Sequence, residues 1–189
     1  MKTTILKIFT IVFTMFTLNA VAQVNKTIDV QSSSIHWLAK KLVGQHEGTI
    51  NFKSGSLELT NDKLTGGSFV VDMNSLTATD LTGDYLGKLN GHLKNPDFFD
   101  VTKHPTSTLV FKKVTDNNSG NYTVVADLTI KDITKSITFD ISLASNNATT
   151  KLTVDRTQYD IKYNSGSFFE NLGDKMIEDN FTLDIVLKY

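Results

Sequence analysis

Short runs of alternating apolar and polar residues recur along most of the chain. Alternation with a period of two is typical of β-strands that bury one face and expose the other to solvent. We interpret the pattern as roughly eight to ten antiparallel strands in a sandwich or barrel. The clearest runs cover residues 49–53, 68–73, 108–112, 122–130, 136–143, 152–155 and 181–189.

Turn-forming residues lie between these runs. Glycine, asparagine, aspartate and serine gather at residues 53–56, 65–67, 116–120 and 145–147, which predicts a turn at each place. A long antiparallel sheet has to hide its edges, and closure into a barrel removes them altogether. The pattern therefore predicts an all-β fold, an antiparallel barrel of about eight strands.

One segment follows a helical period instead. Near residues 79–94 the apolar positions Leu81, Tyr85, Leu86, Leu89 and Leu93 are three or four apart, which places them on one face of a helix. Asn95-Pro96 ends this helical insertion because proline cannot continue the hydrogen-bond ladder. Burial of each phenylalanine in the following Phe98-Phe99 pair gains about 2 kcal/mol. We expect the helix and this loop to form a lid across one end of the barrel.

The alternation also identifies side chains that face the barrel interior. An eight-stranded barrel is at the size where the interior is either filled by side chains or holds one small ligand, and periodicity alone leaves both possibilities open. The predicted apolar cavity is lined by Trp37, Ile50, Phe52, Phe69, Val71, Met73, Leu89, Phe98, Phe99, Leu109, Phe111, Leu128, Ile130, Ile137, Phe139, Leu183 and Ile185.

Residues 1–22 have the three parts of a cleaved secretory signal. Lys2 and Lys7 precede an apolar run at residues 8–18, and Ala20-Val21-Ala22 forms a cleavage site of small residues. The run is well short of the roughly 20 residues that a membrane-spanning helix needs, so we expect no stable membrane insertion. Residues 23–189 are then expected to form a single domain in the periplasm or outside the cell.

Composition narrows the possible functions. The chain has no cysteine, which excludes disulfides, thiol nucleophiles and cysteine metal ligands. Once Lys2 and Lys7 leave with the signal, 17 basic residues face 20 acidic ones. The net charge of −3 provides no bulk attraction for nucleic acid.

The candidate chemistry for an enzyme is sparse. The four histidines, His36, His46, His92 and His104, include no close pair of the kind that a zinc site uses. No serine lies in a Gly-x-Ser-x-Gly elbow, and Ser165-Gly166-Ser167 resembles one only loosely. We therefore expect no catalytic residue, no metal site and no cofactor. A secreted lipid-acting hydrolase or metal-dependent enzyme that uses the histidines stays as an alternative.

Several short motifs spread over nearly all of residues 24–189 identify a family. They are Trp37 with Lys41, Gly44-x-His46-x-Gly48, Leu64-x-Gly66-Gly67, residues 71–76 and 89–93, Asp97-Phe98-Phe99-Asp100-Val101, His104-Pro105-Thr106, residues 128–131 with Thr134-Lys135, and Asp155-Arg156-Thr157-Gln158-Tyr159. Each motif alone is weak. In combination they resemble the YceI-like family of lipocalin-like, polyisoprenoid-binding periplasmic proteins.

The resemblance implies a lipocalin-like barrel with a helical insertion around an elongated apolar cavity. The implied ligand is an isoprenoid lipid, such as a polyprenol, a polyprenyl phosphate or an isoprenoid quinone, and the family is compatible with a homodimer. A polar headgroup would lie at the cavity mouth, where the candidate cations and donors are Lys40, Lys41, His46 and Arg156. Asp132 and Asp160 depart from the family pattern, which usually has glycine at both positions. A solid barrel that acts as a stress-response interaction module is a further alternative.

Overall fold

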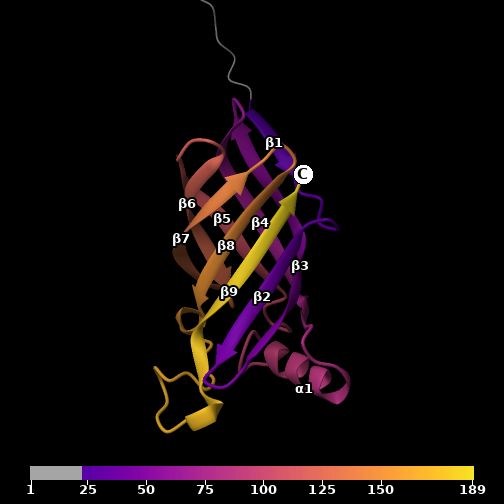
Figure 1. Cartoon of the computed structure of the whole chain (residues 1–189), viewed down its shortest axis with the longest axis vertical. Helices are drawn as coiled ribbons and strands as arrows, with labels where there is room; N and C mark the ends of the chain where they lie inside the picture. The colour runs from indigo at the N-terminus through magenta and orange to yellow at the C-terminus, as the bar shows by residue number, and fades with distance from the viewer. Residues whose placement is uncertain (1–22) are drawn as a thin grey trace, which may run out of the picture.

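The chain forms a closed barrel of antiparallel strands, seen in the computed structural model of residues 23–189 (Figure 1). The predicted secretory signal, residues 1–22, lies outside these described residues. The strands are β1 (Gln23–Thr27), β2 (Ser34–Lys41), β3 (Gln45–Thr60), β4 (Lys63–Ala78), β5 (Thr106–Asp116), β6 (Asn121–Ile130), β7 (Ile133–Leu143), β8 (Asn147–Asp155) and β9 (Ile177–Lys188). The helices are α1 (Gly83–Lys94) and two short 3-10 turns, η1 (Arg156–Tyr159) and η2 (Gly173–Lys175).

Eight strands close the barrel. Their order is β3-β2-β9-β8-β7-β6-β5-β4, and β4 pairs again with β3. One edge of β3 has two partners. Residues 45–50 of β3 pair with β2, and residues 56–60 pair with the short β1. The predicted antiparallel barrel of about eight strands is confirmed.

The closing pair, β3 with β4, is a hairpin of two long strands whose register shifts at three places. Its turn is Asn61-Asp62, with φ of 50° and 61°, which is the left-handed geometry of a tight hairpin. The turns predicted at residues 53–56 and 65–67 are wrong, because both segments lie inside these strands. Gly55 lets the ring of Phe69 pack directly against the backbone of β3, since a Cβ atom on Gly55 would lie 2.4 Å from that ring.

A bulge in β4 shapes the lower part of the barrel wall. Residues 73–76 lie opposite the single residue Ile50, between the pairs Asn51–Asp72 and Thr49–Thr77. The hydroxyl of Ser75 accepts a hydrogen bond from the backbone N–H of Asn51 (2.8 Å) and thereby satisfies a donor that the bulge would leave unpaired. The bulge turns Met73 and Leu76 into the barrel, where both are buried.

Helix α1 begins at Gly83, four residues later than predicted. Residues 79 and 80 instead extend β4 beside β3, because the N–H of Thr79 donates to the carbonyl of Glu47 (2.9 Å) and the carboxylate of Asp80 lies 2.7 Å from Nδ1 of His46. The helix ends at Lys94, as Asn95-Pro96 predicted. Tyr85 was wrongly assigned to the buried stripe and is 74% exposed.

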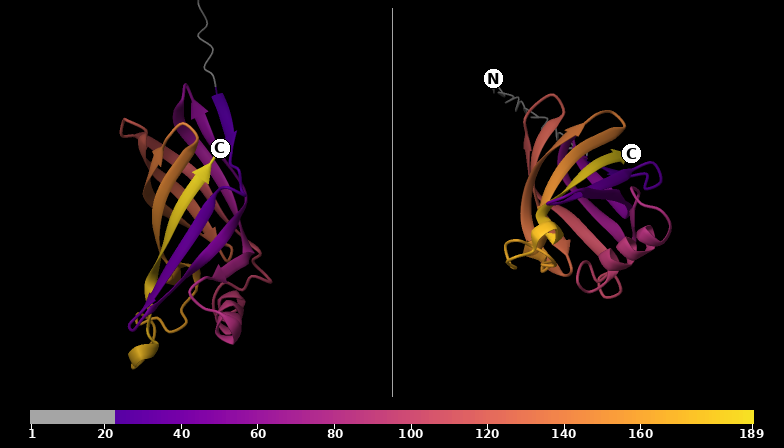
Figure 2. Two further views of the ribbon diagram at one scale, coloured as in Figure 1. Left: turned by 45° about the vertical axis from the view of Figure 1, so that its right-hand side comes forward. Right: turned by 60° about the horizontal axis from the view of Figure 1, so that its bottom comes forward.

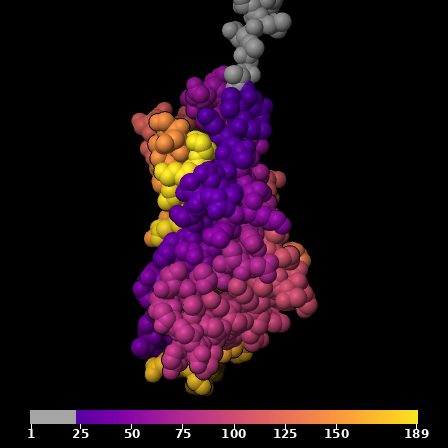
Figure 3. All heavy atoms as spheres, turned by 90° about the vertical axis from the view of Figure 1, so that its right-hand side faces the viewer, coloured from indigo at the N-terminus to yellow at the C-terminus, as the bar shows by residue number. Residues whose placement is uncertain are grey.

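Helix α1 is fixed to the bulged end of β4 by polar contacts. The side-chain oxygen of Asn90 accepts from the N–H of Ala78, and its amide donates to the hydroxyl of Thr77, both at 2.9 Å. Lys94 Nζ donates to the carbonyl of Asn74 (2.7 Å). In the space-filling view of Figure 3, the helix and the adjoining residues, in magenta, form a broad bulge over the lower half of the molecule.

The two ends of the barrel differ. The β2–β3 hairpin, α1 and the segment 161–176 gather at the lower end in Figure 1, which we call the helix end. Figure 2 shows that α1 and the segment 161–176 lie on different sides of this end. The opposite end carries the Asn61-Asp62 turn, β1 and the C-terminus.

The two departures from the family pattern keep the backbone geometry that glycine favours. Asp132 has φ of 59° in the turn between β6 and β7, and Asp160 has φ of 58° at the end of η1. Aspartate tolerates the left-handed region better than most residues, so both turns are preserved. Each aspartate also gains a partner, His104 for Asp132 (3.0 Å) and Lys162 for Asp160 (2.8 Å).

Two glycines allow a matched test of the fold. A Cβ atom on Gly48 would lie 2.0 Å from the carbonyl oxygen of Thr77 and 2.6 Å from the ring of Trp37, whereas Gly87 in α1 has open space around it. We expect Gly48→Ala to lower the free energy of unfolding by about 3 kcal/mol. We expect Gly87→Ala to raise it by roughly 0.5–1 kcal/mol. Urea denaturation measures both, and a similar change in the two variants would contradict the packing described.

Candidate functional site

The barrel interior contains an apolar cavity at the helix end. It has a volume of about 130 Å³. Its wall combines strand residues such as Trp37, Met73 and Leu128 with Leu93 of α1 and Phe98 of the following loop. Its full lining is Ile35, Trp37, Ala39, Ile50, Val71, Met73, Leu76, Leu93, Phe98, Phe99, Ser107, Leu128, Ile130, Arg156, Ile161, Ile177, Glu178, Phe181 and Leu183.

A smaller compartment of about 60 Å³ lies further along the barrel. Four phenylalanines, Phe52, Phe69, Phe111 and Phe139, form a chain across this part, with successive ring centroids 6.0, 5.8 and 5.9 Å apart. Aromatic pairs at such distances each add about 0.5–1.5 kcal/mol beyond the burial of their area. The half of the barrel away from α1 is therefore largely filled by side chains.

The two compartments share part of their walls. Ile35, Val71, Ser107, Leu128 and Leu183 line both. The two compartments are thus neighbours separated by a shared apolar wall.

Most of the residues predicted to line the cavity do so. Of that predicted set, Leu89 and Ile137 lie in the wall of neither compartment, although both pack against the core. Sequence reasoning missed Leu76, Ile161 and Ile177. Leu76 enters the wall through the β4 bulge, and Ile161 belongs to a segment without regular alternation. Ile177 is the first residue of β9, four residues before the alternating run predicted at residues 181–189.

Three aromatic side chains connect α1 with the segment 161–176 at the helix end. The ring of His92 in α1 lies edge-on to Phe98 (4.9 Å between centroids) and to Tyr163 (4.5 Å). Phe98 and Tyr163 are 5.5 Å apart. Because Phe98 also lines the cavity, this cluster forms part of its cover.

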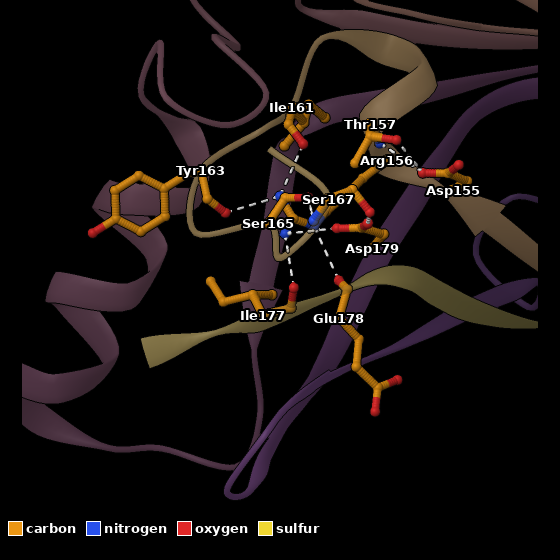
Figure 4. Close-up of polar contacts among 10 residues, drawn as sticks. All are labelled: Asp155, Arg156, Thr157, Ile161, Tyr163, Ser165, Ser167, Ile177, Glu178 and Asp179. Atoms are coloured by element: carbon orange, nitrogen blue, oxygen red, sulfur yellow. Dashed lines mark hydrogen bonds and ion pairs between the residues drawn. The ribbon is translucent and has the colours of Figure 1, made fainter. Parts of the chain in front are cut away.

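Arg156 is buried and is held by backbone carbonyl oxygens and by Asp179, whose Oδ1 lies 3.5 Å from Nη2 (Figure 4). Its guanidinium donates to four carbonyl oxygens, those of Ile161 (2.8 Å), Tyr163 (3.0 Å), Ile177 (3.0 Å) and Glu178 (3.0 Å). Burial lowers the pKa of Arg156, while the charges of Asp179 and Asp155 oppose that shift. Arg156 lies in the cavity wall as predicted, but its donors hold the segment 161–178 in place and are not free for a headgroup.

The other predicted mouth residues lie at the helix end but outside the cavity wall. Lys40 is exposed, and Lys41 is half-buried next to the hairpin. His46 holds Asp80 through the 2.7 Å contact described above. Burial raises the pKa of Asp80, but hydrogen bonds from His46 and from the N–H of Glu47 outweigh it and leave the pKa below its usual value.

Of the five buried side-chain polar atoms without a hydrogen-bond partner among residues 23–189, two belong to residues of the hydrophobic core. They are the indole Nε1 of Trp37 and the hydroxyl of Tyr159. Burial, with the charge of Asp155 as a smaller cause, raises the pKa of Tyr159 to about 12. Unpaired buried donors are rare, and Trp37 belongs to the cavity wall. A ligand oxygen within reach of Nε1 would satisfy this donor.

The residues considered for enzyme chemistry each have a local polar partner. Each histidine has one carboxylate neighbour, and no group of three or more potential ligands positioned for a metal ion occurs in the described part of the chain. Ser165 is fully buried and its hydroxyl accepts from the N–H of Ser167 (3.2 Å).

No helix of residues 23–189 is long and apolar enough to cross a membrane.

A closed eight-stranded barrel with an unfilled apolar interior under a helix defines the class of lipocalin-like β-barrels. The model of the YceI-like domain family matches residues 27–189, and the chain belongs to this family. Two UPF0312 proteins from strains of Vibrio vulnificus are each 31% identical to it over 94 residues, 49% of this chain and 47% of theirs. The chain thus spans about half the length of the curated relatives it matches.

Solved structures share the fold at low sequence identity. BcnA of Burkholderia cenocepacia has a TM-score of 0.69 at 18% identity and covers 85% of this chain and 98% of its own. A polyisoprenoid-binding domain from Saccharophagus degradans has a TM-score of 0.56 at 15% identity, over 89% and 97% of the two chains. The YceI protein of Campylobacter jejuni has a TM-score of 0.53 at 17% identity, over 74% and 84%.

The position of Arg156 gives a specific prediction. Arg156→Met would leave four backbone carbonyl oxygens, all buried or partly buried, without their donor, so we expect the free energy of unfolding to fall by about 3 kcal/mol or more. Hydrogen exchange of the segment 161–178 should accelerate before that of the strands. Lys151→Met is the control, because the exposed Lys151–Asp184 pair contributes at most about 0.5 kcal/mol. Equal losses in the two variants would show that the Arg156 contacts do not hold this segment.

Proposed function

We propose that this protein binds an isoprenoid-type lipid, such as a polyprenol, a polyprenyl phosphate or an isoprenoid quinone, inside the barrel and carries or shields it. The single observation that carries the proposal is the unfilled apolar cavity under the helical lid. Burial of each CH₂ of a ligand gains about 0.8 kcal/mol, offset by the cost of association. An apolar interior thus supports binding without catalytic groups.

The family supports the same ligand class. A solved relative of this fold, the domain from Saccharophagus degradans, is described as polyisoprenoid-binding. The unpaired Nε1 of Trp37 in the cavity wall favours a ligand that carries an oxygen atom, such as a prenol hydroxyl or a quinone carbonyl. Because the donors of Arg156 are engaged, a phosphate headgroup would rely on Lys40 or Lys41 at the rim of the barrel.

The size of the interior sets a condition on binding. A cavity of about 150 Å³ holds one benzene molecule, so the larger compartment accommodates on the order of one isoprene unit as it stands. A longer chain would extend into the smaller compartment, which requires the shared wall around Ser107 and Leu128 to move apart. We propose that the two compartments join when such a chain binds.

We further propose that the protein works in the periplasm or outside the cell. The predicted cleaved signal at residues 1–22 and the absence of cysteine support this placement. Comparison of the N-terminal residue of the protein in whole cells and in an osmotic-shock fraction tests it. Processed protein beginning near Gln23 in the shock fraction or in the medium is the expected result, and unprocessed protein retained in the cell would contradict it.

Trp37 is the only tryptophan in the chain and reports on the cavity directly. We expect its fluorescence to change on titration with geraniol and with the longer geranylgeraniol. Ser107→Leu adds apolar volume where the compartments meet, and we expect it to weaken geranylgeraniol binding by at least about tenfold and geraniol binding by less. Mass spectrometry of an organic extract of the purified protein is expected to detect an isoprenoid lipid.

Val110→Leu is the matched control, because Val110 lies in the same strand and is exposed. Its affinities should equal those of the unchanged protein, and circular dichroism should show the same barrel in all variants. A Ser107→Leu protein that binds both prenols as well as the control would contradict joined compartments. Failure of the unchanged protein to bind either prenol, together with a lipid-free extract, would refute the proposed ligand class.

A further inference from the structure

Large apolar side chains are exposed at one end of the molecule. Leu42 and Val43, at the tip of the β2–β3 hairpin, are 57% and 64% exposed, and Phe168 and Phe169, in the segment 161–176, are 50% and 51% exposed. Of the eight large hydrophobic residues exposed among residues 23–189, six lie at the helix end. Neighbouring exposed apolar residues of this kind mark a contact surface.

The two loops that carry these side chains are joined. The N–H of Leu42 donates to the carbonyl of Met176 (3.0 Å), and Lys41 pairs with Ile177 at the start of β9. Both loops project from the lower end of the barrel in Figures 1 and 2. We call residues 40–46 and 160–176 together the tip loops.

Lysines flank the apolar side chains of the tip loops. Lys40 and Lys41 directly precede Leu42, and residues 40–46 contain no acidic residue. Lys162 lies over the ring of Phe168 (5.1 Å) and also pairs with Asp160. Residues 40–46 carry a net charge of +2, and residues 160–176, with Lys175, Glu170 and Asp174 included, carry −1. The tip loops together carry +1, whereas the remainder of residues 23–189 carries −4. Apolar tips with lysines beside them match the boundary between lipid tails and anionic headgroups.

The cavity lies behind the tip loops. Ile161 and Ile177, at the two ends of the segment 161–176, line the larger compartment, as does Ala39 directly before Lys40. A hydrocarbon ligand that leaves a bilayer at this end would therefore pass from lipid to cavity over a short distance. Two narrow projecting loops suit insertion among headgroups, whereas a protein partner needs a broader complementary face.

We propose that the tip loops dock the helix end on the surface of an anionic bilayer, with Leu42, Val43, Phe168 and Phe169 inserted among the headgroups. The lysines contact the lipid phosphates, and the cavity faces the membrane. The purpose of this contact, exchange of lipid, rests on the proposed function, whereas the contact itself does not. Under this proposal the ligand comes from the bilayer, and exchange takes place at the helix end of the barrel.

Vesicle sedimentation tests the proposal. Residues 23–189 form the closed barrel by themselves, so protein beginning at Gln23 is mixed with vesicles of phosphatidylethanolamine and phosphatidylglycerol, or of phosphatidylcholine alone. We expect binding to both, stronger to the anionic vesicles and weakened by salt. The double variants Leu42→Ser/Val43→Ser and Phe168→Ser/Phe169→Ser should each lose at least about tenfold in partition coefficient.

Val24→Ser is the matched control, since Val24 is 45% exposed in β1 at the opposite end. It should bind vesicles as the unchanged protein does. Three results would overturn the proposal: no vesicle binding by the unchanged protein, equal losses in the control and the tip variants, or no loss in the tip variants. A dimer that sedimentation analysis detects and the tip variants abolish would also overturn it, in favour of a second copy of the chain.

Prenol binding separates this proposal from the proposed function. The tip variants leave the cavity wall unchanged, so their Trp37 fluorescence response to geraniol in solution should equal that of the unchanged protein. Vesicle binding without prenol binding would refute the proposed function and leave the docking surface supported. Prenol binding without vesicle binding would refute the docking surface and leave the proposed function supported.

Discussion

The pairing of β3 with β4 is the contact on which the rest of the structure depends. It runs the length of two 16-residue strands and converts an open sheet into a closed barrel. Its register shifts also shape the interior, because the bulge at residues 73–76 turns Met73 and Leu76 inward. The same bulge leaves Thr77 and Ala78 in position to hold Asn90 of α1. Closure, cavity wall and lid attachment therefore arise from one hairpin.

The interior is a compromise between packing and space. The chain of phenylalanines fills one half with favourable ring contacts, while the half beneath α1 keeps about 130 Å³ unfilled. Empty apolar volume costs stability because the lining atoms lose contacts that a filled core would give. The well-packed half and the hydrogen-bonded Arg156 support the half that remains open. Such a division would keep the barrel closed with or without the proposed ligand.

Alternation along the chain was sufficient to predict the barrel and most of the cavity wall, and the gain from burying the Phe98-Phe99 pair predicted the inward position of Phe98. The sequence-based prediction failed at residues whose type is common in more than one structural role. Gly55 was read as a turn, although in β3 it makes room for the ring of Phe69. Arg156 was read as a headgroup ligand, because a sequence shows the charge but not the four carbonyl oxygens that converge on it. These errors concern long-range contacts, which a local pattern does not encode.

Helix α1 carries a kinetic consequence. It has no side-chain hydrogen bond at its N-terminal cap, no fully buried residue, and Gly87 and Gly91 on open surface. A short helix with these features frays at a lower free-energy cost than the strands beneath it. If the proposed ligand binds inside the barrel, its entry and exit would then require unfolding of this one helix, while the strands stay paired. The residence time of that ligand would then depend on the helix, whereas the melting temperature of the barrel would depend on the strands.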